Sequence, residues 1–163
     1  MSTRGVIYVH SSPSAVCPHV EWAISGVLDA RVVLDWTAQE AAPGTARAEV
    51  SWAGPVGTAA RVATALRAWG MVRFEVTEDP SPGTDGERFS HVPGLGLWHG
   101  RTSANGDIVL GEDQVRAALA GAGTRESLTR RMDDLLGTRW DDALEEFRFA
   151  GEGVAPARLH QVG

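Results

Sequence analysis

The first half of the chain alternates between short strand-like stretches and helical patterns. Residues 5–10 are apolar on both faces, which is typical of a central strand covered on both sides. Residues 31–38, 46–52 and 72–77 alternate between apolar and polar positions, which is the period of half-buried strands. The turn at residues 42–45, Ala-Pro-Gly-Thr, predicts that the first two of these three strands form a hairpin.

Two helical patterns lie between these strands. From Ser14 to Leu28 the apolar residues recur with the helical period, and Pro18 as first helical residue favours Cys17 over Ser14 as the cap. A second helix opens within residues 54–58, with a proline just inside its start, and Gly70 ends it. The element order is therefore βαββαβ, the ferredoxin-like arrangement.

The second half predicts a hairpin followed by helices. Residues 78–88 form an acidic loop, for which a solvated turn is favoured over a cation site because the spacing does not fit a calcium loop. Residues 95–101 and 108–110 form a hairpin closed by Asn105-Gly106. Three helices follow at about residues 112–120, 124–136 and 139–147, with Asp113, Thr124 and Thr138 as caps.

These patterns predict an α/β (α+β) protein with a ferredoxin-like βαββαβ core, an added β-hairpin and C-terminal helices. We expect residues 1–111 to contain the core and the hairpin, residues 112–149 to form a helical extension packed on the core, and residues 150–163 to be a loose tail. The outward faces of strands 46–52 and 72–77 are polar. Something must cover the middle of that face, and the C-terminal segment is the available candidate.

Composition excludes several classes of function. The formal charge of -6, from 15 basic and 21 acidic residues, disfavours a nucleic-acid partner. The chain has no lysine, which excludes Schiff-base and pyridoxal chemistry, and its one cysteine excludes an intrachain disulfide. No apolar run approaches the ~20 residues that cross a bilayer, and the N-terminus lacks an apolar signal core. We expect a cytoplasmic protein without a membrane partner or a cofactor.

The expected fold brings two helix starts together. Strands 5–10 and 46–52 are adjacent and parallel in a ferredoxin-like sheet, so the helices that follow them begin at the same edge. Two helix N-termini that converge offer unpaired N–H groups and positive dipole ends to an anion. The alternative is that these groups only cap their own helices. The expected ligand-binding residues are Ser11, Ser12, Ser14, Gly54, Gly57 and Thr58.

The same junction holds the weak catalytic candidates of the chain. Cys17 at a helix start, with His10 or His19 as base, is the arrangement of a nucleophile for acyl transfer. A lone cysteine is more often a small buried apolar residue, and we therefore favour a binding module over an enzyme. No metal site is predicted, because the Cys-Pro-His spacing is not an established ligand pattern and a fourth zinc ligand would have to come from His91 or His99.

Protein docking is a further alternative. Trp98 on the second hairpin, together with Arg130 and Arg131 on a C-terminal helix, has the composition of an interface anchor. The competing interpretation is that Trp98 packs under the C-terminal helices, and it is favoured because those helices need an apolar floor.

Six segments of the chain carry a resemblance to a known family. They are His-Ser-Ser-Pro at 10–13, Cys-Pro-His-Val-Glu-Trp-Ala at 17–23, Trp-Ala-Gly-Pro-Val-Gly-Thr at 52–58, Phe-Glu-Val-Thr-Glu-Asp-Pro at 74–80, Asp-Gly-Glu-Arg-Phe at 85–89 and Ala-Asn-Gly-Asp at 104–107. With these segments the chain resembles, over nearly its whole length, an actinobacterial family of uncharacterised proteins, the domain of unknown function 3145.

The resemblance implies no activity and no catalytic residues. It does imply a role near fatty-acid synthesis, and hence an acidic acyl carrier protein as a partner, which the arginine cluster at 125–139 would dock only in part. We expect an uncharacterised binding or regulatory module that holds an anionic small molecule between two helix starts. The alternatives are a cysteine-dependent acyl-transfer enzyme and a protein-docking factor.

Overall fold

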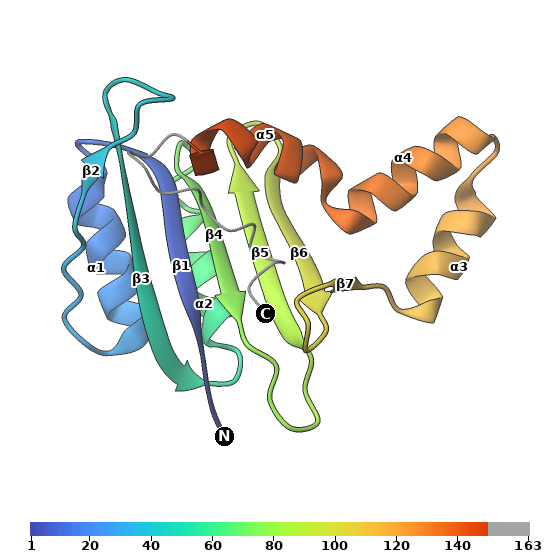
Figure 1. The fold of residues 1–163 in the computed structure, drawn as a ribbon, viewed down its shortest axis with the longest axis horizontal. Coiled ribbons are helices and arrows are strands. Elements are labelled where there is room, and N and C mark those ends of the chain that lie inside the picture. The colour runs from blue at the N-terminus through green and yellow to red at the C-terminus, as the bar shows by residue number, and fades with distance from the viewer. Residues whose placement is uncertain (150–163) are drawn as a thin grey trace.

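The chain folds around a seven-stranded antiparallel sheet in the computed structural model, which describes residues 1–149 (Figure 1). The strands are β1 (Ser2–Pro13), β2 (Thr37–Ala38), β3 (Thr45–Pro55), β4 (Arg73–Glu78), β5 (Gly86–Val92), β6 (Gly96–Thr102) and β7 (Ile108–Val109). The helices are α1 (Cys17–Leu28), α2 (Thr58–Leu66), α3 (Glu112–Gly121), α4 (Arg125–Leu136) and α5 (Thr138–Phe149). The spatial order of the strands is β2-β3-β1-β4-β5-β6-β7.

The α+β class expected from the sequence is confirmed. The first six elements follow the order βαββαβ, and the hairpin of β6 and β7 and the three C-terminal helices are present. The expected parallel pairing of residues 5–10 with 46–52 is wrong. Strands β1 and β3 are adjacent but antiparallel, with Ile7 opposite Val50.

The direction of β3 follows from the path of the chain after α1. The carboxylate of Glu21 on α1 accepts hydrogen bonds from the backbone N–H of Leu34 at 3.1 Å and from Nε1 of Trp36 at 2.8 Å. These contacts hold the connecting segment along the helix, so the chain returns to the end of the sheet where α1 began. Strand β3 then starts beside the end of β1, with Thr45 opposite Pro13, and runs back along it.

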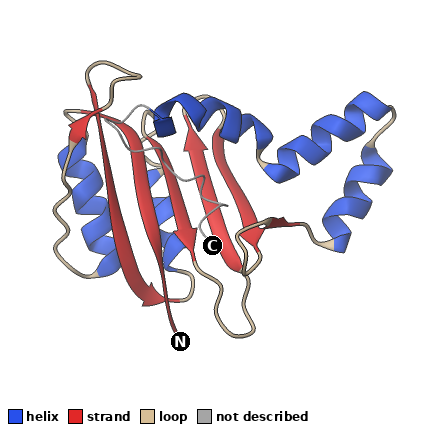
Figure 2. Ribbon diagram, viewed as in Figure 1, coloured by secondary structure: helices blue, strands red, loops and turns tan. Residues whose placement is uncertain are grey.

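Helices α1 and α2 cover one face of the sheet (Figure 2). Alternate residues of the central strands point into this layer, which contains the main hydrophobic core. Gly5 allows β1 and β4 to approach closely there, because a Cβ atom at this position would lie 1.8 Å from the carbonyl oxygen of Thr77. The buried residues of the main core are Ile7, Val9, Val20, Ile24, Leu34, Trp52, Ala59, Val62, Ala63, Leu66, Val72, Phe74, Val76 and Phe89.

Helix α5 lies across the opposite, polar face of the sheet (Figures 1 and 2). It buries Trp140, Leu144 and Phe147, and it contacts β1 and β5. The prediction that the C-terminal segment covers this face is therefore confirmed. Helices α3 and α4 extend away from the sheet beyond β7 as a helical arm, and α4 has no buried residue.

Two helix starts differ from their predicted positions. Val16 precedes α1 as its N-cap without a side-chain hydrogen bond, so neither Ser14 nor Cys17 is the cap. Pro55 is the last residue of β3 rather than part of a helix, and Gly57, with φ of 95°, precedes α2. A left-handed φ of this kind favours glycine.

Other boundaries were predicted with mixed success. Of the predicted strand 31–38, only Thr37–Ala38 pair with β3. Strand β5 was missed, since its first residues were assigned to the acidic loop. Thr124 caps α4 as predicted, accepting a hydrogen bond from the Ser127 N–H at 3.1 Å, whereas Asp113 lies inside the first turn of α3. The predicted tail 150–163 lies outside the described residues.

Candidate functional site

The predicted cleft between two helix starts is not formed. Helix α1 follows the end of β1, whereas α2 follows the end of β3, and these strands are antiparallel. Gly54 is opposite Thr3 at one end of the pair, and Ser12 is opposite Ala46 at the other. From Thr3 to Ser12 an extended chain covers roughly 30 Å. Ser11, Ser12 and Ser14 therefore cannot share a ligand with Gly54, Gly57 and Thr58.

The hydroxyl groups near α1 have partners within the protein. Ser12 Oγ donates to the carbonyl of Pro13 at 3.2 Å, and Ser14 Oγ donates to the carbonyl of Gly44 at 3.3 Å. Ser11 Oγ accepts a hydrogen bond from a guanidinium nitrogen of Arg73 at 3.3 Å. These three serines therefore have partners within the protein, but none of them caps α1, which begins without a side-chain cap hydrogen bond.

The start of α2 is occupied by a carboxylate of the same chain. Glu78, at the end of β4, accepts hydrogen bonds from the N–H groups of Gly57 and Ala59 at 3.0 and 3.1 Å. Thr58 Oγ1 donates to the carbonyl of Pro55 at 2.6 Å. The helix dipole and free N–H groups that an anion would use are thus already compensated by Glu78.

Cys17 does not form a nucleophile and base pair with a histidine. The thiol is buried and donates to the carbonyl oxygens of Ser12 and Pro13, with Sγ to oxygen distances of 3.8 and 3.5 Å. His10 contacts Glu75 instead, and the ring of His19 stacks on a tryptophan. Within residues 1–149 no hydrogen bond joins Cys17 to either histidine, which agrees with the interpretation of Cys17 as a structural residue.

Trp98 packs under the C-terminal helices and is no exposed anchor. Only 6% of it is accessible, and its Nε1 donates to the carbonyl of Asp134 in α4 at 3.0 Å. The absence of a side chain at Gly137 makes room for its indole ring. Arg130 and Arg131 are exposed on α4, whereas Trp98 is buried.

A buried polar cluster on the face under α5 was not predicted from the sequence. Its centre is Glu75 on β4, which is completely inaccessible to solvent. Glu75 Oε1 lies 2.8 Å from His10 Nε2, and Oε2 accepts a hydrogen bond from Ser90 Oγ at 3.1 Å. Arg148 of α5 binds both carboxylate oxygens at 2.8 Å through Nε and one terminal nitrogen. Such a two-point contact fixes both position and orientation.

The charges of this cluster shift one another's pKa. Burial alone raises the pKa of the Glu75 carboxyl, but hydrogen bonds and charge from His10 and Arg148 outweigh it and lower that pKa from 4.5 to about 2. Burial alone lowers the pKa of Arg148, yet its contacts with Glu75 and Asp141 raise that pKa above its ordinary value. Glu75 and Arg148 are therefore both charged at neutral pH.

Arg88 on β5 lies beside this cluster but outside its hydrogen bonds. Only 3% of the residue is accessible, and its buried Nε has no hydrogen-bond partner in the described part of the chain. Arg88 forms an ion pair with Asp141, in which a terminal guanidinium nitrogen lies 3.8 Å from Oδ2. The other carboxylate oxygen of Asp141, Oδ1, accepts a hydrogen bond from Arg148 at 2.9 Å. The guanidinium also lies 5.3 Å from the ring centroid of Trp98. Burial lowers the pKa of Arg88.

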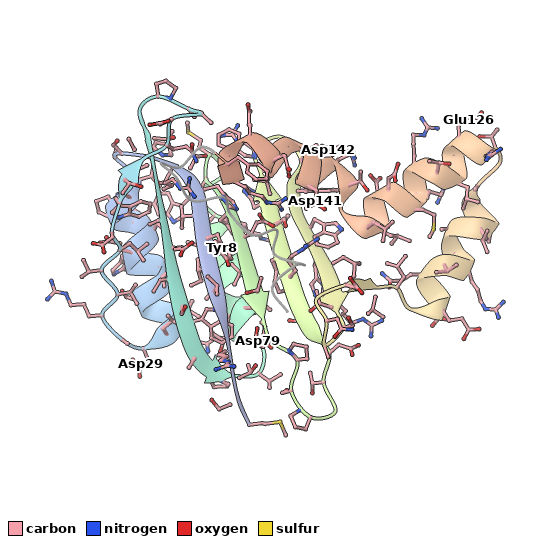
Figure 3. The ribbon with its side chains drawn as sticks, in the orientation of Figure 1. Tyr8, Asp29, Asp79, Glu126, Asp141 and Asp142 are labelled. Atoms are coloured by element: carbon pink, nitrogen blue, oxygen red, sulfur yellow. The ribbon has the colours of Figure 1, made fainter. Side chains whose placement is uncertain are left out.

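Arg88 lines a cavity of about 110 Å³ at the lower part of the same face. Tyr8 lies over the middle of the sheet and Asp79 lies near the end of β4, while Asp141 is on α5 (Figure 3). The cavity is formed by side chains of the four central strands and the turn after β6. Its lining residues are Val6, Tyr8, Thr77, Glu78, Asp79, Glu87, Arg88, Thr102, Ala104 and Gly106.

The acidic residues of this cavity already have partners. Asp79 is 3.3 Å from Nε of Arg4, and Glu87 is 3.4 Å from a ring nitrogen of His99. Glu78 binds the N–H groups at the start of α2. Among the charged residues that line the cavity, Arg88 is the one with a buried side-chain nitrogen, Nε, that has no hydrogen-bond partner in the described residues.

Tyr8 adds a neutral donor to the cavity. Burial, with smaller contributions from the negative charges of Glu49 and Glu75, raises the pKa of its hydroxyl above the ordinary value of 10. The hydroxyl therefore remains protonated at neutral pH and can donate a hydrogen bond. The Thr102 hydroxyl and the Arg88 guanidinium are further hydrogen-bond donors among the residues that line the cavity.

Part of this cluster had a signal in the sequence. The alternation of residues 72–77 places Glu75 on the polar face, and the need for a cover on that face was predicted from the same pattern. The prediction of this cluster failed because β5 was not recognised as a strand. Three of its polar residues, Arg88, Ser90 and His91, are buried. A strand whose polar residues are buried has no clear alternation of apolar and polar positions, so its first residues were assigned to the acidic loop and the rest to no element.

Two wider features bear on the choice of function. In the described residues no helix has the length and apolar character needed to span a membrane. The same residues contain no cluster of three or more histidine, cysteine, aspartate or glutamate side chains arranged to hold a metal ion.

Comparison with known proteins places the chain in a family. Neither a curated protein nor a solved structure is significantly similar to it. The sequence model of one family, described as Protein of unknown function (DUF3145), matches residues 6–161. Because this match covers nearly the whole chain, the protein belongs to the DUF3145 family of proteins of unknown function.

Proposed function

We propose that the protein is a binding module for a small anion-bearing metabolite, a phosphate or a short carboxylate, held in the cavity that Arg88 lines. The observation that carries this proposal is the buried Nε of Arg88, which has no hydrogen-bond partner within residues 1–149. A buried donor without an acceptor costs about 1–3 kcal/mol, and more when it is charged. An anion in the cavity supplies the missing acceptors, so its binding relieves a cost that the free protein carries.

Other arginines of the same sheet face support an anionic ligand. Arg47 on β3 and Arg73 on β4 each have one buried nitrogen without a hydrogen-bond partner. The guanidinium of Arg73 lies 4.3 Å from the ring centroid of Phe147 on α5, which places it on the face that this helix covers. Three cationic side chains with unused donors on one face favour a negative ligand over a neutral or positive one.

The size of the cavity limits the ligand. A volume of about 110 Å³ is smaller than the ~300–1,000 Å³ of sites for drug-sized molecules. It fits a phosphate group or a short carboxylate and leaves no room for a nucleoside or a long acyl chain. We propose binding without a chemical step, because Cys17 is buried and His10 is held by Glu75.

Thermal unfolding in the presence of phosphate, sulfate, acetate and malonate tests the proposal, with sodium chloride of equal ionic strength as reference. A ligand at ~100 times its dissociation constant adds about 2.7 kcal/mol to the stability of the fold. We expect at least one anion to raise the melting temperature of the wild type. Arg88→Met should abolish this rise, whereas Arg101→Met, an exposed arginine outside the cavity, should keep it.

The ligand-free stability of the variant provides an internal check. Replacing a buried, poorly paired charge by an apolar side chain of similar length is often neutral or stabilising. Arg88→Met should therefore fold at least as stably as the wild type while losing the anion effect. A wild type that responds to none of the anions, or an Arg88→Met variant that responds equally, contradicts the proposal.

A second candidate function is docking of an acidic protein by the helical arm. The observation that favours it is the exposure of α4, which has no buried residue and carries Arg130 and Arg131 on its surface. The partner in acyl metabolism that the family resemblance implies would be acidic and would fit this arm. Charge reversal at Arg130 and Arg131 should remove a salt-sensitive partner from pull-downs, whereas reversal at Arg61 on α2 and at Arg67, the C-cap of that helix, should not.

A further inference from the structure

The outer edge of β3 is an open strand edge. Strand β3 runs over Thr45–Pro55, but β2, its neighbour on that side, pairs only with Ala46 and Arg47. Within the part of the chain that the structure describes, no other strand pairs with this edge. The lower half of β3 is therefore unpaired on one side.

The direction of the free backbone groups follows from the neighbouring contacts. The N–H of Val6 donates a hydrogen bond to the Thr77 hydroxyl, and the carbonyl of Arg4 accepts one from the backbone N–H of Asp79. The even-numbered residues of this part of β1 therefore direct their backbone N–H and carbonyl groups toward β4. The odd-numbered residues of β1 direct their backbone groups toward β3. The residues of β3 opposite them, such as Val50 opposite Ile7, direct their backbone groups toward β1.

The residues between these partners direct their groups outward. Glu49, Ser51 and Ala53 therefore present N–H and carbonyl groups at the edge of the sheet, and all three are exposed. The hydrogen bond from the Gln39 N–H to the Thr45 carbonyl, at 2.9 Å on the same side, agrees with this alternation. A row of exposed, unpaired backbone groups is a template for pairing with a further strand.

We propose that this edge pairs with the same edge of a second copy of the chain, in an antiparallel arrangement with its two-fold axis at Ser51. Ser51 then lies opposite Ser51 of the second copy, and Glu49 lies opposite Ala53. The three pairs exchange about six backbone hydrogen bonds, two for each hydrogen-bonded pair. The two sheets join into one continuous sheet.

The strand itself favours a second copy in this register. A two-fold interface requires a self-complementary surface, and an antiparallel edge centred on one residue meets that requirement. A register centred on Glu49 would place two carboxylates opposite each other, which is unfavourable, whereas the register centred on Ser51 places Glu49 opposite a small neutral residue. The pairing ends where β2 occupies Arg47 and where Pro55 lacks an N–H group.

Exposed apolar side chains lie on the same side of the molecule. The segment between α1 and β2 runs along this side in Figure 1 and exposes 69% of Val33, and α1 beside it exposes 76% of Trp22. Joining the two sheets brings these surfaces of the two copies toward each other. Burial of apolar surface near the strand pair adds to the backbone hydrogen bonds.

Analytical ultracentrifugation from low to high micromolar concentration tests the proposal, and we expect a dimer in the wild type. Ser51→Pro removes an outward N–H without touching the ladder to β1, so it should give a folded monomer, whereas Ser51→Ala should remain dimeric. A wild type that is monomeric at the highest concentration overturns the proposal. So does a Ser51→Pro variant that dimerises like the wild type.

A second pair of variants tests the register and does not depend on proline. Ala53→Glu places a carboxylate opposite Glu49 of the second copy at both symmetric positions, and we expect it to raise the dimer dissociation constant about tenfold. Ala53→Arg, at the same exposed position, creates opposite charges and should leave the dimer intact or strengthen it. Equal dissociation constants for the two variants contradict the register centred on Ser51.

Discussion

The buried ion pair between Glu75 and Arg148 should determine how the stability of this protein depends on pH. Glu75→Gln keeps the shape of the side chain but removes its charge, so it imitates the protonated carboxyl. The lowering of the Glu75 pKa from 4.5 to about 2 corresponds, at about 1.4 kcal/mol for each pH unit, to about 3 kcal/mol. This is the expected loss in the free energy of unfolding of the variant at neutral pH.

The sign follows from the direction of the shift. Because the folded pKa lies below the unfolded value of 4.5, the pair stabilises the fold fully above that value, and this contribution is lost as the pH falls toward 2. The difference between wild type and Glu75→Gln should therefore be constant near neutral pH and should shrink to near zero at about pH 2. Other acids titrate in both proteins and cancel in the difference.

Removing the partner tests the same pair from α5. Arg148→Met leaves the carboxylate of Glu75 buried without its two-point contact, and breaking a buried pair in this way costs about 3–5 kcal/mol. The double variant Glu75→Gln/Arg148→Met should lose less than the sum of the two single changes, because the second change removes a group that has already lost its partner.

Urea unfolding followed by tryptophan fluorescence between neutral pH and pH 2 measures these free energies. Glu112→Gln is the matched control, since Glu112 and Arg116 form an exposed ion pair on α3, and its effect should stay below about 0.5 kcal/mol. A Glu75→Gln variant as stable as the wild type at neutral pH would refute the reasoning. A difference that does not change with pH would refute the assignment of the titration to Glu75.

Three further changes have defined outcomes. The Cys17 thiol should react with iodoacetamide in the native protein far more slowly than in urea, because it is buried, and equal rates would show that it is exposed. Gly5→Ala should reduce urea-measured stability by at least ~2 kcal/mol, since the new Cβ would overlap the Thr77 carbonyl, and near-wild-type stability would contradict that close approach. Trp98→Ala should cost about 3–5 kcal/mol and speed hydrogen exchange near Asp134, and unchanged exchange there would show that Trp98 does not hold the arm.

The sequence predicted most elements and both hairpins, but not the direction in which β3 pairs with β1. The period of residues 46–52 and 72–77 was sufficient to assign strands, because one face of each is apolar and the other polar. The direction of β3 depends on the contacts of Glu21 with Leu34 and Trp36, which hold the connection along α1. Leu34 and Trp36 lie 13 and 15 positions after Glu21 in the sequence, and hydrogen bonds over such separations leave no periodic signal. The parallel pairing was therefore expected instead.

The error in the site follows from the error in the pairing. Once β3 runs antiparallel to β1, the two helix starts lie at opposite ends of the sheet, and Glu78 occupies one of them. The residues that do come together, Glu75, Arg88 and Arg148, lie in three separate segments. Their proximity depends on the pairing of β4 with β5 and on how α5 crosses the sheet, and local patterns do not contain that information.

The buried cluster and the cavity beside it have different physical explanations. A buried ion pair is seldom more stabilising than apolar packing, but it can fix one orientation of a helix on a sheet, and the two-point contact of Arg148 with Glu75 is suited to that. Arg88 makes a longer contact with the same helix, since Asp141 is hydrogen-bonded to Arg148 at 2.9 Å and lies 3.8 Å from Arg88. A structural role for the cluster therefore accounts for Arg148 but does not account for the buried Nε of Arg88, which has no hydrogen-bond partner among the described residues. That distinction is the reason to look for the ligand at Arg88.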